Sequence, residues 1–85
     1  MRMTEWNTLL AYANTLCHEA SEETGVKIDY SPYSMYDGRK GIKIIVFDCN
    51  GEEFTSYTSG TGINNDYDEV KAGVLRAIEK VKAVI

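Results

Sequence analysis

Hydrophobic residues recur along the chain with a helical period at both ends. Between Thr4 and about Thr24 they return every three or four positions, which predicts an amphipathic helix. Thr4 is the expected N-cap of this helix, and Gly25 is the expected left-handed C-cap. The stripe comprises Trp6, Leu9, Leu10, Ala13, Leu16, Cys17 and Ala20. A second stripe of the same period predicts a second helix that runs to the C-terminus. The candidate N-caps of this helix are Asn64, Asn65 and Asp66. Its stripe comprises Tyr67, Val70, Val74, Ala77, Ile78, Val81 and Ile85.

The middle of the chain alternates polar and apolar residues instead, as strands do. Val26 to about Tyr30 predicts a half-buried strand. Pro32 lacks an N–H donor, so we expect the residues after it to form an edge strand or an irregular strand. From Ile42 to Ser59, two β-rich runs flank Asn50-Gly51. This dipeptide is typical of a tight hairpin turn.

The predicted hairpin is apolar on both faces. A two-residue turn would set Phe47 opposite Phe54 and Ile44 opposite Tyr57. One face then collects Ile42, Ile44, Val46, Thr55 and Tyr57, and the other collects Ile45, Phe47, Cys49 and Phe54. The first face is the longer aliphatic one, so we expect it to form the core.

The order helix, strand, strand, strand, helix predicts one compact α+β domain over residues 1–85, with a three-stranded antiparallel β-meander and two flanking helices. Two helices packed on one face leave the other uncovered. Exposure of Ile45, Phe47 and Phe54 would then mark a surface for a partner, which is another protein or a second copy of the chain. Two alternatives are that the helices cover both faces, or that Tyr and Thr make the outer face tolerable to water.

Charge narrows the class of partner. The chain carries thirteen acidic and nine basic residues, a formal net charge of −4. Nucleic-acid binders concentrate Lys and Arg, so this balance disfavours nucleic acids and anionic membranes. No apolar run approaches the ~20 residues of a transmembrane helix, and the polar N-terminus lacks the apolar core of a signal peptide. We therefore expect a cytoplasmic protein.

Candidate catalytic and metal-binding groups are few. Cys17 and His18 are neighbours on a helix, so their side chains diverge by about 100° and form no nucleophile–base pair. Two cysteines and one histidine also provide neither a disulfide framework nor a zinc site. We expect no enzymatic activity, metal or cofactor.

The segment from Tyr30 to Gly41 has the composition of a binding loop. It combines tyrosines with Ser, Gly, Pro, Met and Arg, which together give large contact area and adaptable polar contacts. The alternative is an edge strand whose tyrosines pack their rings and solvate their hydroxyls. We assign Tyr30, Tyr33, Tyr36 and Arg39 to a partner-binding site.

We also expect a rim of acidic residues that attracts a basic partner or mimics the phosphates of a nucleic acid. This rim comprises Glu52, Glu53, Asp66, Asp68 and Glu69.

The element order, with Gly60-Thr61-Gly62 before the last helix, resembles the double-stranded-RNA-binding domain. That resemblance implies nucleic-acid binding through lysines at the start of the final helix. Here those positions read Asn65-Asp66-Tyr67-Asp68-Glu69. In its shortness and acidity the chain is also similar to small phage-encoded inhibitors, including anti-CRISPR proteins. We therefore expect a non-enzymatic protein-binding module, an inhibitor or regulator that occludes a partner's surface. The alternative is a nucleic-acid-binding domain.

Overall fold

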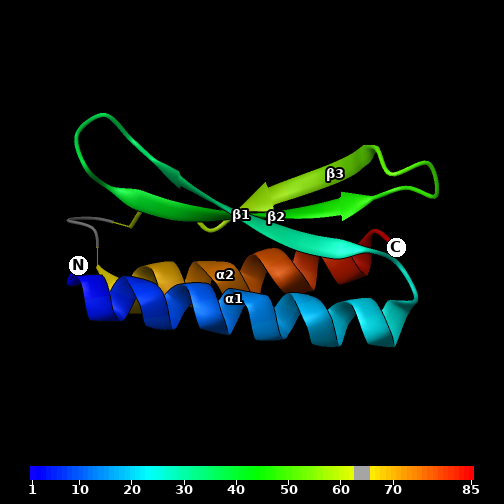
Figure 1. Cartoon of the computed structure of the whole chain (residues 1–85), viewed down its shortest axis with the longest axis horizontal. Coiled ribbons are helices and arrows are strands. Elements are labelled where there is room, and N and C mark those ends of the chain that lie inside the picture. Colours follow the sequence, from blue (N-terminus) through cyan, green and yellow to red (C-terminus); the bar gives the residue numbers. More distant parts are fainter. Residues whose placement is uncertain (63–65) are drawn as a thin grey trace.

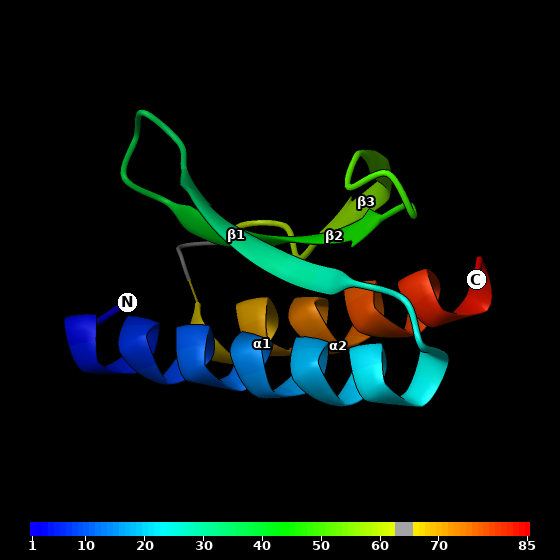
Figure 2. The same ribbon diagram turned by 45° about the vertical axis from the view of Figure 1, so that its right-hand side comes forward.

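The computed structural model describes residues 1–62 and 66–85, and it has the predicted order of elements. They are α1 (Met3–Thr24), β1 (Ile28–Ser34), β2 (Lys40–Phe47), β3 (Glu53–Thr58) and α2 (Tyr67–Ala83). The strands form one antiparallel sheet in the order β1-β2-β3. Both helices lie side by side against the same face of that sheet, and both begin at the same end of the molecule (Figures 1 and 2). The predicted α+β fold is confirmed.

The ends of the helices follow local hydrogen bonding. The prediction of Thr4 as N-cap is wrong: α1 begins earlier, and the Arg2 amide donates to Glu5 Oε1 at 2.9 Å. Gly25 is confirmed as the C-cap, since its φ of 71° is left-handed and its N–H reaches Ser21 O. Asp66 caps α2 by accepting from the Asp68 amide. The other two candidates, Asn64 and Asn65, lie outside the described residues.

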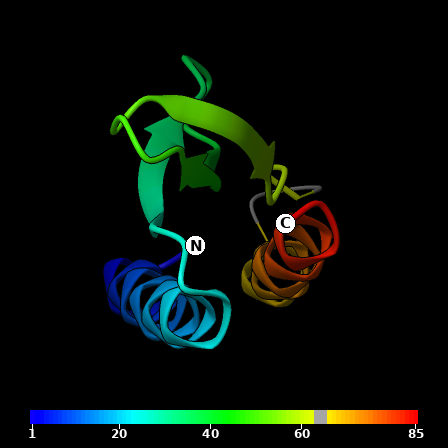
Figure 3. The ribbon, with the colours of Figure 1, turned by 90° about the vertical axis from the view of Figure 1, so that its right-hand side faces the viewer.

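The core lies between the sheet and the two helices, as the end-on view in Figure 3 shows. The β2 residues Ile42, Ile44 and Val46 are buried there, so the prediction that their face is the core face is confirmed. The helices contribute the predicted stripes, in particular Leu9, Ala13 and Cys17 from α1 and Val70, Val74, Ala77, Ile78 and Val81 from α2. The periodicity of the sequence thus selected most of the buried positions correctly. Ile85 is the exception, because α2 ends at Ala83 and Ile85 is exposed.

A bulge at the end of the β2–β3 hairpin changes the predicted pairing. Ile44 faces Tyr57 as expected, but Phe47 faces Glu53 because the register shifts between Val46 and Phe47. The prediction that Phe47 faces Phe54 is therefore wrong. The Asp48 side chain accepts from the amides of Asn50 and Glu52, which builds a wider loop than a two-residue turn. Phe54 becomes the extra residue of β3.

The end of β3 is held against α2 at very close range. A Cβ at Gly73 would collide with the Ser59 backbone, coming within 2.8 Å of its carbonyl carbon. Ser59 is itself fixed, because its amide donates to Ile42 O at 2.8 Å and its hydroxyl accepts from the Ile42 amide at 2.9 Å. The glycine therefore allows backbone-to-backbone packing of α2 on the sheet.

Among residues 1–62 and 66–85, no helix is both long and apolar enough to cross a membrane.

Candidate protein-binding surfaces

The β1–β2 hairpin forms an arm, residues 31–40, that rises away from the helix layer at the end where both helices begin (Figures 1 and 2). Its tip is a short turn in which Met35 donates to Arg39 O at 2.7 Å and Gly38 donates to Met35 O at 2.9 Å. Gly38 has a φ of 92°, which a residue with a side chain adopts only under strain. Backbone hydrogen bonding therefore defines the shape of the tip.

An aspartate–arginine pair reinforces this tip. The Asp37 carboxylate accepts from the Arg39 amide at 3.1 Å and from Arg39 Nε at 2.8 Å. These interactions, the backbone hydrogen bond first, hold the pKa of Asp37 below its usual value. Beside the pair, Tyr36 is fully exposed and Met35 is 41% exposed. The arm thus presents two large side chains on an ordered turn.

Tyr30 and Tyr33, the other two tyrosines assigned to the binding site, pack against the body of the domain more than Tyr36 does. Tyr30 lies opposite Ile44 and packs its half-buried ring against the core. Tyr33 lies on the opposite face, where its ring covers Gly41 so closely that a Cβ there would come within 2.6 Å of the ring. Of the tyrosines assigned to the binding site, Tyr36 alone is exposed over its whole side chain.

The outer face of the sheet is uncovered by either helix, as predicted (Figure 3). Ile45 and Phe47 lie on it and are half-buried. Lys27 Nζ lies 5.1 Å from the centre of the Phe47 ring, and Lys43 pairs with Glu53 at 3.2 Å. The face is therefore a mixed surface in which single apolar side chains stand among charges.

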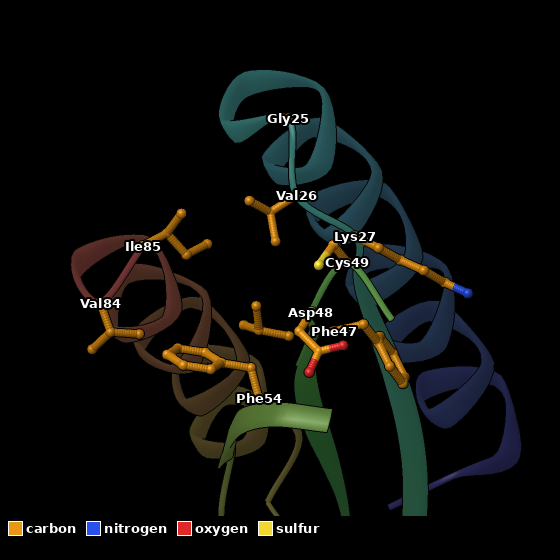
Figure 4. A pocket seen from close by; sticks show the side chains of 10 residues that line it. Gly25, Val26, Lys27, Phe47, Asp48, Cys49, Phe54, Val84 and Ile85 are labelled. Carbon is orange, nitrogen blue, oxygen red and sulfur yellow. The ribbon is translucent and has the colours of Figure 1, made fainter. Parts of the chain in front are cut away.

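Phe54 does not join that face. Its ring is 63% exposed and points toward Val84 at the end of α2, as Figure 4 shows. It lines a groove of about 530 Å³ between the start of β1, the β2–β3 loop and the C-terminal end of the chain. Its apolar walls also include Val26 and Ile85. The sequence pattern missed this groove because it depends on the bulge at Phe54 and on α2 ending at Ala83, two residues before Ile85.

The acidic residues do not form one rim. Glu52 and Glu53 belong to the β2–β3 hairpin, whereas Asp66, Asp68 and Glu69 lie at the start of α2, at the opposite end of the molecule (Figure 1). The prediction of a single acidic rim is therefore wrong. The structure instead places the acidic start of α2 at the same end as the arm.

The two residues considered for catalysis, Cys17 and His18, lie in different environments on α1. Cys17 is buried, and that burial, followed by the charge of Asp29, raises the pKa of its thiol to about 12. His18 is exposed and pairs with Glu22 at 3.2 Å along α1. Cys49 is exposed at the rim of the groove. Within the described part of the chain, no three His, Cys, Asp or Glu side chains gather closely enough to hold a metal ion.

Comparisons of the chain with protein-family models, with curated protein sequences and with solved structures found no match.

Proposed function

We propose that this protein is a small binding module that acts on another protein through the β1–β2 arm. The observation that carries the proposal is Tyr36, a fully exposed aromatic side chain on a hydrogen-bonded turn raised away from the body of the domain. Tyrosine is enriched among the residues that dominate binding energy, since its ring buries large area and loses only two torsions.

The order of the tip supports this role. Binding normally costs conformational entropy when a loop and its side chains become fixed. Here the two hydrogen bonds to Asp37 and the turn closed by Met35 and Arg39 already define the backbone before a partner arrives. A partner would therefore gain contact with Tyr36 and Met35 at a reduced ordering cost.

The acidic start of α2 suggests the charge of the partner. Asp66, Asp68 and Glu69 lie at the end of the molecule from which the arm rises. A partner with an apolar pocket for Tyr36 and a basic surface beside it would satisfy both features. By covering such a surface the domain would act as an inhibitor or regulator of a protein that handles acidic ligands or nucleic acids.

The test compares capture of a partner by the wild type and by a Met35→Ala/Tyr36→Ala double variant. The matched control is Leu75→Ala, which removes a similarly exposed apolar side chain from α2. We expect the double variant to lose the captured protein and the control to retain it, and titration of the purified partner to show at least a tenfold weaker Kd. Equal binding by the wild type and the double variant would refute the arm as the site.

A second candidate is nucleic-acid binding, which the helix-strand-strand-strand-helix order with both helices on one face favours. The charges at the start of α2 oppose it, because carboxylates there would repel phosphates. A gel-shift titration with duplex RNA at low salt separates the two candidates. Sub-micromolar binding that weakens steeply with added salt would establish the second in place of the first.

A further inference from the structure

The two edges of the sheet differ in how their backbone groups are satisfied. At the β1 edge, the residues whose backbone points away from β2 are Ile28, Tyr30, Pro32 and Ser34. Their neighbours in the alternation bond inward, since the Lys27 carbonyl accepts from Phe47 of β2 and the Met35 amide donates to Arg39, just before β2. The Ser21 hydroxyl accepts from the Ile28 amide at 3.0 Å and donates to its carbonyl at 3.1 Å.

The remaining outward positions of β1 are also closed to a further strand. The Tyr30 amide donates to Asp29 Oδ1 at 2.8 Å, and Pro32 has no amide hydrogen to offer. Side-chain bonds and proline are common means by which an edge strand avoids pairing with another chain. The β1 edge is therefore blocked along most of its length.

The β3 edge carries none of these blocks in the described residues. The Ser59 amide bonds to β2, so the alternation of an antiparallel pair turns the backbones of Ser56 and Thr58 outward. Within residues 1–62 and 66–85, no side chain bonds to these two backbones. The strand also contains no proline and no lysine. It is the open edge of the sheet.

We propose that this edge pairs with the β3 strand of a second copy of the chain, giving a two-fold symmetric dimer with a continuous six-stranded antiparallel sheet. An axis at Tyr57 sets Ser56 of each copy opposite Thr58 of the other. The two outward residues then exchange four backbone hydrogen bonds reciprocally. On one face of the sheet the small hydroxyl side chains of Ser56 and Thr58 face each other across the seam, and on the other face the two Tyr57 side chains meet at the axis.

The charges on α2 favour a second copy as the occupant. The side of α2 next to β3 carries Glu69 near its start, beside Gly62, and then Arg76 and Lys80 further along. A two-fold axis reverses the helix, so the acidic start of one copy runs toward the basic part of the other. Arg76 forms no ion pair with any described residue, which leaves its guanidinium available to the partner copy.

The test is the molar mass of the wild-type chain by light scattering and sedimentation from 5 to 500 µM. We expect the mass to rise from that of one chain to that of two. Ser56→Pro removes an outward amide without touching the β2–β3 ladder, and both copies lose it, so the dimer Kd should rise roughly tenfold or more. Ser34→Pro is the matched control, since it removes an outward amide at the other edge and should leave the dimer intact.

Ser56→Lys is a second variant that keeps the amide, so it guards against a failure of the proline variant to fold. It places two lysines diagonally across the axis and should also weaken the dimer. A strict monomer at 500 µM would overturn the proposal, as would a dimer that Ser56→Pro and Ser56→Lys leave unchanged. Because the arm lies at the other strand pair, Met35→Ala/Tyr36→Ala should not alter the mass, so this test is independent of the proposed function.

Discussion

Gly73 offers a sharp test of how α2 packs on the sheet, because two effects of Gly73→Ala oppose each other. An alanine in a helix interior is favoured over glycine by about 1 kcal/mol. Against this, the new Cβ would collide with the carbonyl of Ser59 and lie 3.0 Å from its Cα. Helix propensity alone therefore predicts a more stable protein, and packing predicts a less stable one.

The cost of the collision should exceed the gain in helix propensity, because the Ser59 backbone is bonded to β2 and cannot move away by itself. Ser59 is tied to β2 by its amide, at 2.8 Å from Ile42 O, and by its hydroxyl, at 2.9 Å from the Ile42 amide. Overpacking of a tight site costs about 1–3 kcal/mol, and relief here would separate α2 from the sheet. After the propensity gain is subtracted, we expect a net loss of roughly 1 kcal/mol, which for a domain of this size lowers Tm by about 4–8 °C.

Urea unfolding followed by circular dichroism measures this loss as a lower midpoint with an unchanged m-value. Ala72→Gly is the control, because Ala72 is the exposed neighbour of Gly73 on the same helix. It should cost about 1 kcal/mol from propensity alone. A Gly73→Ala protein as stable as the wild type, or more stable, would show that α2 does not approach the sheet as closely as described.

Four further predictions concern single residues. Ser59→Ala should lower the free energy of unfolding by about 1–3 kcal/mol, measured in urea, because it leaves a buried β2 amide without an acceptor. At pH 7.5 a maleimide should label Cys49 in the folded protein and Cys17 only after unfolding, which mass spectrometry can follow. Equal labelling of both cysteines in the folded protein would contradict the burial of Cys17. Burial raises the pKa of the Cys17 thiol from 9.0 to about 12, so the unfolded chain loses this proton at a lower pH than the folded chain does. The free energy of unfolding should therefore fall as the pH rises above 9, and Cys17→Ser should make this fall less steep. Asp37→Ala should speed hydrogen exchange of the Arg39 amide, and unchanged exchange would mean that Asp37 does not order the tip.

The sequence predicted the elements well because helices and strands have different side-chain periods. The stripes of α1 and α2 became the buried faces, and the face with Ile42, Ile44 and Val46 became the core face of the sheet. Pro32 was expected at an edge, and it lies in β1 with its missing amide at the outward side. Each of these predictions depends on residues a few positions apart, where local geometry decides the outcome.

Positions that depend on the loop at Asn50-Gly51 were predicted less well. The dipeptide favours a two-residue turn, but the Asp48 carboxylate binds two amides of the loop and shifts the register by one residue. That shift carries Phe54 from the predicted outer face into the groove beside Val84. One local hydrogen-bonding side chain thus outweighed the general preference of the turn.

The sequence by itself determined the order of the elements and the faces they bury, since periodicity and burial of apolar side chains act along each segment. Only the tertiary structure decided which surfaces remain outside. In it, both helices pack on one face of the sheet and Tyr36 is exposed at the tip of the arm. The two acidic groups lie at opposite ends of the molecule, and β3 is the open edge of the sheet. These features arise from contacts between different elements, such as Gly73 of α2 against Ser59 at the end of β3, which no pattern along the chain encodes.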